Sequence, residues 1–369
     1  MSAEKLLSDL VGFASVVGTP NLTVMAFVRE YLASHGISCR ILPGPEGDRA
    51  NLFATIGDAS RPGYVLSGHV DVVPAGEPEW LADSFLLRTD GERLIGRGAC
   101  DMKGFVAAVL AAAPGLAAMD LAAPVHIALS YDEEAGCKGV PHLLAALPEL
   151  CAPPLGAIIG EPTGLVPVLA HKGKAAVRLS ARGISGHSSR PDLGRNAIHA
   201  LVPVLAEAIV QAEALKGGPQ DARFAPPCST LQIGTVAGGQ AVNIIPDRAE
   251  ARLEARAIAG VDPRTLLEPV IAKAAEMGVE SEILSSYPAL ALDAAAPLAA
   301  LAEAVSGHAP LGAVSFGTEA GLFQQAGIPA IICGPGDIAR AHRPEEYITR
   351  GELESTRAMV LALGRHLSA

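Results

Sequence analysis

The stretch "VLSGHVDVVPAGEPEW", residues 65–80, begins as an apolar strand and carries His69 and Asp71 two positions apart. A strand places residues i and i+2 on the same face, so the imidazole and the carboxylate point the same way. Burying both groups costs free energy unless each finds a partner. Two interpretations are open at this point: a core histidine paired with an aspartate, or a metal-binding imidazole oriented by a neighbouring carboxylate.

The segments around this strand alternate between apolar strands and helical patterns. Strands are expected over residues 63–73, 125–134 and 156–162, and helices over 102–113 and 140–147. Such alternation predicts crossover connections and a mainly parallel sheet. The same rhythm returns near Pro297 and ends in a helix that starts at about Arg350.

A different order of elements separates these two parts of the chain. The pattern predicts a strand over 175–183, a helix over 196–215, strands over 229–239 and 247–258, a helix over 262–278 capped by Asp262, and a strand over 279–284. The order βαββαβ is that of a ferredoxin-like unit. We therefore predict an α/β domain of residues 1–173 and 286–369, interrupted by an inserted α+β domain of residues 174–285.

The composition limits the kinds of partner and compartment. The chain has 369 residues, is 50% hydrophobic and carries a formal net charge of −11, which argues against binding nucleic acid or an anionic membrane. Its six cysteines form no CxxC pair, as expected of free thiols in a reducing compartment. Glu4 and Asp9 stand where a signal peptide needs a basic and then an apolar stretch, and the apolar run 105–119 contains Pro114. We expect a cytoplasmic protein without membrane or nucleic-acid partners.

Acidic residues and histidines cluster where the predicted parallel strands end. Ligands of open parallel sheets gather at the carboxyl ends of the strands, and carboxylates that converge there repel one another unless cations join them. Each residue alone could be a helix cap, a solvated turn or a surface loop residue. Two histidines and three carboxylates from this cluster would form a nitrogen and oxygen donor set suited to zinc, cobalt or manganese, in a two-metal site. The residues of the cluster are His69, Asp71, Asp101, Glu133, Glu134, Glu161 and His342.

The motifs that hold these residues resemble those of a known enzyme family. In chain order they are "SGHVDVVP", "GRGACDMKG", "YDEEAG", "GEPT", "SGHSSRP", "NIIPD" and "AHRPEEY", spanning residues 67–347. They look like the metallopeptidase family that contains acetylornithine deacetylase, succinyl-diaminopimelate desuccinylase and related carboxypeptidases. The resemblance implies a di-metal catalytic domain with an inserted lid domain, two divalent ions (zinc first, cobalt second) and a homodimer formed through the lid.

The resemblance also implies roles for individual residues. Asp101 would bridge the two ions, with His69 and Glu161 completing one site and Glu134 and His342 the other. Asp71 would orient His69, and Glu133 would be the general base that takes a proton from water and passes it to the departing amine. The peptide bond between Asp101 and Met102 is expected to be cis.

The substrate is expected to be a small N-acyl amino acid. "ALSYDEEAGCKGV" and "VSFGTEAGLF" look like the acetylornithine deacetylase branch, which implies removal of the acetyl group from N-acetyl-L-ornithine in arginine synthesis. In the lid, Arg256 and Asn243 would hold the α-carboxylate of the substrate. His187, donated by the partner subunit, would stabilise the developing oxyanion. Glu319 would bind the side-chain ammonium.

Two alternatives remain beside this expectation. A desuccinylase, or a broader N-acyl-amino-acid deacylase or carboxypeptidase of the same family, would use the same metal ligands on another substrate. A catalytically inactive relative would act as a binding or scaffold protein instead. The presence of all five predicted ligands and the base argues against the second alternative.

Overall fold

The computed structural model describes residues 1–368 and divides the chain into two compact units. The first unit comprises residues 1–170, 291–312 and 318–368, and the second comprises residues 171–290 and 313–317. The short segment Ala313–Gly317, which the sequence prediction placed in the first domain, lies in the second unit. The reason is local pairing, because Val314 forms a β-bridge with His171.

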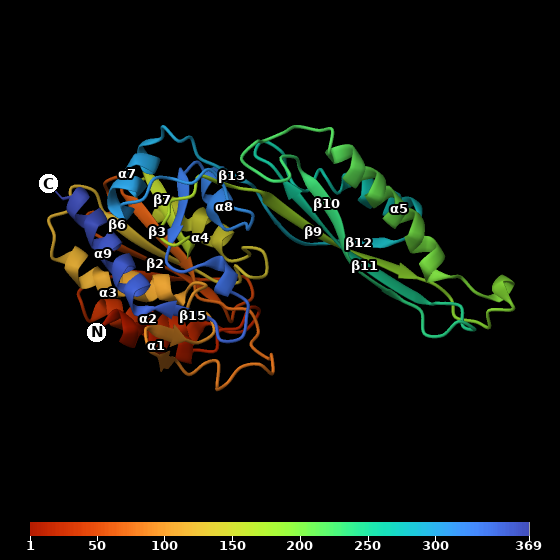
Figure 1. The fold of residues 1–369 in the computed structure, drawn as a ribbon, viewed down its shortest axis with the longest axis horizontal. Coiled ribbons are helices and arrows are strands. Elements are labelled where there is room, and N and C mark those ends of the chain that lie inside the picture. Colours follow the sequence, from red (N-terminus) through yellow and green to blue (C-terminus); the bar gives the residue numbers. More distant parts are fainter. Residues whose placement is uncertain (369) are drawn as a thin grey trace. The chain divides into compact units, whose positions relative to one another are not determined.

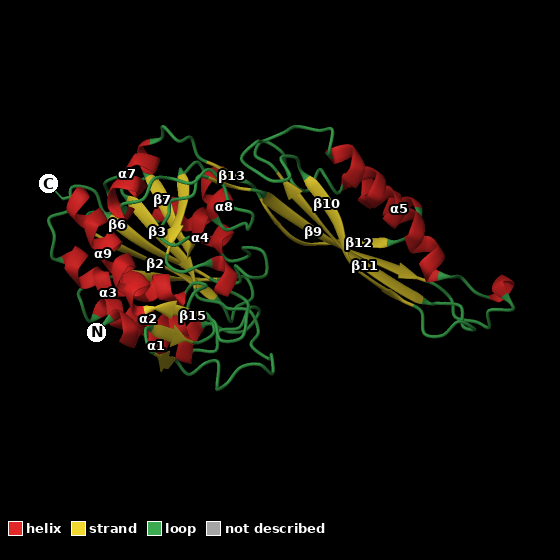
Figure 2. Cartoon of the chain, viewed as in Figure 1, coloured by secondary structure: helices red, strands yellow, loops and turns green. Residues whose placement is uncertain are grey.

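The first unit is built on a six-stranded sheet in the order β1-β2-β6-β3-β7-β14 (Figures 1 and 2). Strands β6, β3, β7 and β14 are parallel, and β2 and β1 are added antiparallel at one edge. The mainly parallel sheet confirms the predicted fold class. The strands are β1 (Cys39–Pro43), β2 (Ala50–Ile56), β3 (Tyr64–His69), β6 (Val125–Ser130), β7 (Gly156–Pro162) and β14 (Ala330–Gly334).

Helices cover this sheet, and its central strands are continuous apolar runs as expected of parallel strands buried on both faces. Helix α3 is apolar all round and almost wholly buried, because it packs on the sheet and also contacts α1 and α9. The helices are α1 (Ala3–Gly12), α2 (Leu22–Ala33), α3 (Lys103–Ala117), α4 (Val140–Ala146), α7 (Pro297–Ser306), α8 (Ala320–Gln325) and α9 (Arg350–His366). Two small sheets accompany them: β4 (Arg88–Asp90), β5 (Arg93–Ile95) and β15 (Tyr347–Thr349), and β8 (Ala170–His171) with β13 (Leu290–Ala291).

The second unit has the predicted βαββαβ order. Its antiparallel sheet runs β10-β11-β9-β12, and α5 and α6 pack against each other and against its strands. The elements are β9 (Gly173–Arg182), α5 (Ala197–Leu215), β10 (Thr230–Gly238), β11 (Arg248–Ala257), α6 (Glu268–Glu276) and β12 (Glu280–Tyr287). By length and composition alone, α5 is a helix that could cross a membrane, and 17% of its apolar window is buried.

One predicted helix start in this unit is wrong. Helix α6 begins at Glu268 rather than Asp262, because Pro269 sits in its first turn, where its missing N–H group costs nothing. Asp262 instead accepts the backbone N–H of Arg264 at 2.9 Å in a preceding turn, so it does not cap the helix.

Candidate metal-dependent active site

The cluster of acidic residues and histidines forms within the first unit, at the carboxyl ends of its parallel strands. His69 is the last residue of β3, and Glu161 is the second-last residue of β7. Glu133 and Glu134 follow β6, whose final residue Ser130 pairs with His69. Asp101 precedes α3, and His342 follows β14. The expected cis peptide bond between Asp101 and Met102 is confirmed.

Asp101 stands between the two histidines. Its Oδ1 lies 3.1 Å from Nε2 of His69, and its Oδ2 lies 3.4 Å from Nε2 of His342. Glu161 Oε1 is 3.8 Å from Nε2 of His69, and Glu134 Oε1 is 3.0 Å from Nε2 of His342. One oxygen of Asp101 therefore faces His69, which lies near Glu161, and the other oxygen faces His342, which lies near Glu134.

The donor atoms are close enough together to hold metal ions. One ligand atom from each of His69, Glu133 and Glu161 lies within 4.8 Å of the others, and the same is true of His69, Asp101 and Glu134. His69 donates its Nδ1–H to the backbone carbonyl of Asp71 at 2.9 Å, so the neutral ring would offer the lone pair of Nε2 to a metal ion. Imidazole nitrogens and carboxylate oxygens in this arrangement fit divalent ions such as zinc.

The electrostatics of the cluster also favour added positive charge. Burial raises the pKa of Glu133 to about 8. Burial also raises the pKa values of Glu134 and Glu161, and the negative charge of Asp101 raises them further. Burial opposes ionisation of Asp101 as well, but hydrogen bonds with both histidines outweigh it and lower its pKa. Contacts with Asp101 and Glu134 raise the pKa of the half-exposed His342 to about 10. Carboxylates this close resist ionisation together, so a bound cation would stabilise them.

Asp71 contacts both His69 and the two adjacent glutamates. Its carboxylate Oδ1 lies 3.6 Å from Nδ1 of His69, farther than its own backbone carbonyl. The carboxylate instead accepts the backbone N–H groups of Glu133 at 3.2 Å and Glu134 at 3.1 Å. Asp71 therefore orients His69 through its main chain and fixes the two glutamates through its side chain.

Glu319, predicted to contact a substrate ammonium, is buried and already hydrogen-bonded within the first unit. It is 1% exposed, and both carboxylate oxygens accept hydroxyl protons, from Ser67 at 2.5 Å and from Ser130 at 2.8 Å. These serines lie on β3 and β6, so Glu319 ties together two adjacent strands below the cluster. Burial separates this carboxylate from solvent, and the two hydroxyl groups fix its orientation.

The sequence interpretation overlooked two buried charged residues, Arg97 and Glu346. Both are 1% exposed, and their side chains are joined by a 2.9 Å hydrogen bond. Glu346 also accepts the backbone N–H of Asp101 at 3.0 Å. The available signal was their position inside the quoted motifs "GRGACDMKG" and "AHRPEEY".

The three remaining predicted residues belong to the second unit and do not all lie together. His187 forms a β-bridge with Ile244, and the N–H of Ser188 donates to the carbonyl of Asn243 at 3.1 Å. His187 and Asn243 therefore occupy neighbouring segments beyond the ends of β9 and β11. Arg256 lies near the other end of β11, so Asn243 and Arg256 of one chain lie toward opposite ends of this strand.

Arg256 is partly held by its own unit. Its Nε donates to Glu254 at 2.6 Å and its Nη1 to the hydroxyl of Tyr287 at 3.4 Å. It pairs across the sheet with Thr230 on β10 and Lys174 on β9. A guanidinium in this position retains donors that can reach a carboxylate.

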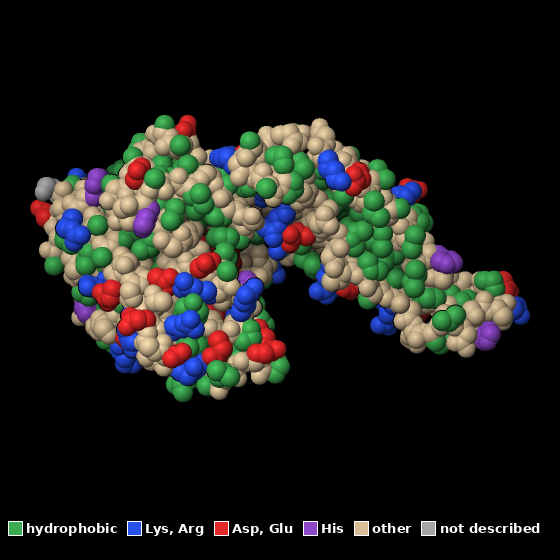
Figure 3. Space-filling model, in the orientation of Figure 1, with side chains coloured by type: hydrophobic (Ala, Val, Ile, Leu, Met, Phe, Trp, Pro, Cys, Tyr) green, Lys and Arg blue, Asp and Glu red, His purple; other side chains and the backbone are tan. Residues whose placement is uncertain are grey.

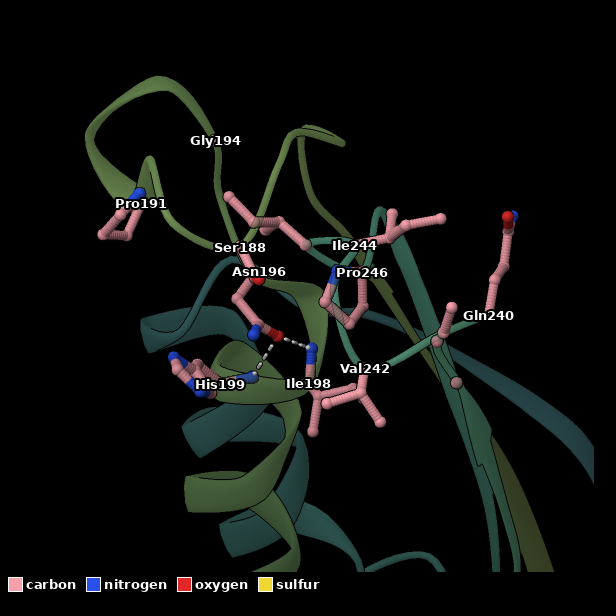
Figure 4. Close-up of a pocket in the computed structure, with 14 residues that line it drawn as sticks. Ser188, Pro191, Gly194, Asn196, Ile198, His199, Gln240, Val242, Ile244 and Pro246 are labelled. Carbon is pink, nitrogen blue, oxygen red and sulfur yellow. Dashed lines mark hydrogen bonds between the residues drawn. The ribbon is translucent and has the colours of Figure 1, made fainter.

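A cavity of about 780 Å³ lies beside the segments that carry His187 and Asn243 (Figure 4). Asn196 lines it while capping α5, because its Oδ1 accepts the N–H groups of Ile198 at 2.9 Å and His199 at 3.2 Å. The other walls include Ser188, Gln240, Val242 and Ile244. This cavity is formed by the second unit alone and contains none of the predicted metal ligands.

A parallel α/β unit with a histidine and carboxylate cluster at its strand ends, joined to a ferredoxin-like insertion, defines a metal-dependent hydrolase. Comparison with known proteins names the family: the chain belongs to Peptidase family M20/M25/M40, whose model matches residues 65–366. It is 32% identical to acetylornithine deacetylase of Myxococcus xanthus, over 98% of this chain and 96% of that protein. It is 33% identical to acetylornithine deacetylase of Yersinia pestis, over 95% of this chain and 92% of that protein.

Solved structures agree with this fold. A metallo-carboxypeptidase of the family from Sulfolobus solfataricus has a TM-score of 0.81 at 20% identity, covering 99% of both chains. Human carnosine dipeptidase 1 has a TM-score of 0.75 at 15% identity, covering 99% of this chain and 96% of that chain. The family resemblance predicted from the motifs is confirmed, and the chain is a metal-dependent amidohydrolase.

Proposed function

We propose that this protein removes the acetyl group from N-acetyl-L-ornithine, releasing L-ornithine and acetate in the cytoplasm as a step of arginine synthesis. The similarity to acetylornithine deacetylases over nearly the whole chain supports this substrate. The single observation that carries the chemistry is the placement of Asp101, whose two oxygens face His69 and His342 separately. That placement is what a carboxylate shared by two ions requires.

Two divalent ions, zinc first and cobalt second, are proposed as the cofactors. His69, Asp101 and Glu161 would hold one ion, and Asp101, Glu134 and His342 the other. When bound, such ions polarise an amide carbonyl and make water more acidic. The main-chain acceptor of His69 keeps its Nε2 available for this task.

Glu133 is proposed as the general base. It is buried beside the ligands, and its backbone is fixed by Asp71, while the thiol of Cys137 donates to its Oε1 at 3.3 Å. Burial raises its pKa to about 8, and neighbouring divalent ions would lower that pKa again, so the carboxylate form would be present near neutral pH. Glu133 would take the proton of the attacking water and deliver it to the nitrogen of the departing amine.

His187 is proposed as the donor to the oxyanion that forms on the amide oxygen. The backbone N–H of Ser189 donates to Nδ1 of His187 at 3.2 Å, so in the neutral ring the proton belongs on Nε2. An N–H group presented there can stabilise negative charge on the reacting oxygen.

The layout of the second unit supports a site shared between two copies. Arg256 pairs with Lys174 at one end of the sheet, whereas His187 lies beyond Arg182 and Arg248 at the other end. Arg256 is eight positions after Arg248 along β11, which corresponds to about 26 Å at roughly 3.3 Å per residue. A small N-acyl amino acid cannot span that length. If Arg256 and His187 contact the same substrate, they come from different chains.

An apolar face of the second unit supports a homodimer. Val202, Ile209 and Val210 of α5 are 53%, 58% and 59% exposed, and Figure 3 shows apolar side chains gathered over this helix. Beside α5 lies β10, an edge strand of the sheet with mostly exposed residues. An apolar helix face next to an open strand edge suits self-association around a two-fold axis.

A substrate panel tests this proposal. The purified protein, loaded with Zn²⁺ or Co²⁺, is assayed for amine release from N-acetyl-L-ornithine, N-succinyl-diaminopimelate, other N-acetyl amino acids and dipeptides. We expect the highest kcat/KM for N-acetyl-L-ornithine and loss of activity after chelation. Preference for the succinyl substrate or a dipeptide would assign another member of the family. Bound metal without any amide cleavage would indicate a binding protein.

A further inference from the structure

A buried guanidinium connects the segments that carry the proposed metal ligands. Arg97, 1% exposed, donates from Nη1 to Glu346 Oε2 at 2.9 Å and to the carbonyl of Arg343 at 3.2 Å. Its Nη2 donates to Glu77 Oε1 at 3.0 Å and to the carbonyl of Pro74 at 3.3 Å. One side chain therefore contacts the segment after β3 and the segment after β14.

Glu346 extends these contacts to Asp101. The oxygen that does not face Arg97 accepts the backbone N–H groups of Cys100 at 2.9 Å and Asp101 at 3.0 Å. Glu346 is itself 1% exposed, so these hydrogen bonds are shielded from water. The position of the Asp101 backbone is thereby fixed by a carboxylate that is fixed in turn by Arg97.

The segment that contains His342 needs such support. His342 and Glu345 both have left-handed backbone conformations, with φ of 58° and 60°. Residues other than glycine adopt this conformation at a cost, and it persists where surrounding contacts hold it. Arg97 supplies one such contact at Arg343, directly after His342.

We propose that Arg97 and Glu346 are positioning residues that set the geometry of Asp101 and His342 for metal binding. Neither side chain needs to touch the ions or the substrate. The inference rests on the proposed function, because it takes Asp101 and His342 as metal ligands. A buried ion pair is by itself weak evidence for stability, since the cost of removing both charges from water offsets their attraction. Its effect is expected in metal affinity, where changes to residues behind the ligands weaken binding about 10–100-fold.

The test compares two variants with a matched control. Glu346→Gln keeps the shape and an acceptor oxygen but loses the charge that faces Arg97, and Arg97→Lys keeps the charge but loses the fork of donors. The control is Arg350→Lys, which alters another arginine–carboxylate pair of the same unit, made with Glu4 through two hydrogen bonds of 2.9 and 3.1 Å. Each metal-free protein is titrated with Zn²⁺ against a chelating dye. Thermal unfolding and hydrogen exchange of the peptide covering residues 97–103 are measured on the same samples.

We expect both variants to fold, to bind Zn²⁺ about 10–100-fold more weakly than wild type and to exchange faster over residues 97–103, with the control unchanged. A folded variant pair with wild-type affinity overturns the inference. If Glu346→Gln does not fold, the Zn²⁺ affinity of Arg97→Lys decides the outcome. If neither variant folds, the Arg97–Glu346 pair is needed for folding itself, and the inference is also overturned. If wild type itself binds no metal ion, the proposed function fails instead.

Discussion

The carboxylate of Asp71 accepts the backbone N–H group of Glu134 at 3.1 Å. This hydrogen bond joins the segment after β3 to the turn after β6, one of its neighbours in the sheet. A second bond from the same carboxylate, to the N–H of Glu133, fixes the adjacent residue as well. The proposed base and a proposed ligand therefore share one anchor, although their own side chains have different tasks.

Replacing this anchor by Asp71→Asn should lower turnover. The amide keeps the size of the side chain, but only one of its two polar atoms can accept, so one of the two N–H groups loses its partner. We expect kcat to fall about 10–100-fold while the protein stays folded. Steady-state kinetics and thermal unfolding of the variant check this. Wild-type kcat in Asp71→Asn would show that the two N–H contacts do not matter for the reaction.

The adjacent glutamates should separate into a base and a ligand. Glu133→Ala is expected to retain both ions and to lose activity about 10²–10⁴-fold, the contribution typical of a general base. Glu134→Ala is expected to lose an ion as well as activity. Metal analysis of dialysed samples, with kcat measured at saturating Zn²⁺, distinguishes the two. Equal metal content in both variants would contradict the assignment.

Mixing two inactive variants should restore activity if the site is shared. In a mixed dimer of Glu133→Ala and His187→Ala, the His187→Ala chain keeps its metal ligands and Glu133 and receives an intact His187 from its partner. Random exchange makes half of the dimers mixed, each with one working site of two, so about a quarter of wild-type activity should return. Mass spectrometry of isotope-labelled chains verifies exchange. Exchange without recovered activity would show that His187 acts within its own chain or not at all.

His126 should make the fold sensitive to mild acid. It is fully buried on β6, its Nδ1 lies 3.0 Å from the hydroxyl of Thr55, and burial lowers its pKa from 6.5 to about 4. The unfolded chain therefore binds a proton at higher pH than the folded protein does, so stability is full above pH 6.5 and declines as the pH falls toward 4.

Urea unfolding of the wild type and His126→Gln at pH 7.5 and 5 measures this contribution. The wild type should lose up to about 2 kcal/mol more than His126→Gln between these pH values. His308→Gln, at an exposed histidine, serves as the control and should follow the wild type. Parallel loss of stability in wild type and His126→Gln would exclude His126 as the source.

The sequence was sufficient where a pattern of neighbouring residues determines the structure. The apolar run of β7 predicted a strand buried on both faces, and the alternating residues of β9 predicted a strand buried on one face. The strand ends likewise predicted that His69, Asp101, Glu134, Glu161 and His342 would converge.

The sequence was insufficient where a side chain has a choice of distant partners. The pattern around Asp71 could not distinguish an imidazole from two backbone N–H groups in the turn after β6. Glu319 was assigned to a ligand, and the sequence did not reveal that its oxygens accept hydroxyl protons from Ser67 and Ser130, which lie 252 and 189 residues earlier in the chain. Such pairings depend on which strands become neighbours.

The separation of His187 from Arg256 along one sheet has a consequence for inhibition. On the shared-site proposal, each lid holds the carboxylate of one substrate with one end and polarises the amide of another with its far end. A tight-binding substrate analogue would then link the two chains wherever it binds. Subunit exchange should slow in its presence, so the lifetime of the dimer would report on how fully the sites are occupied.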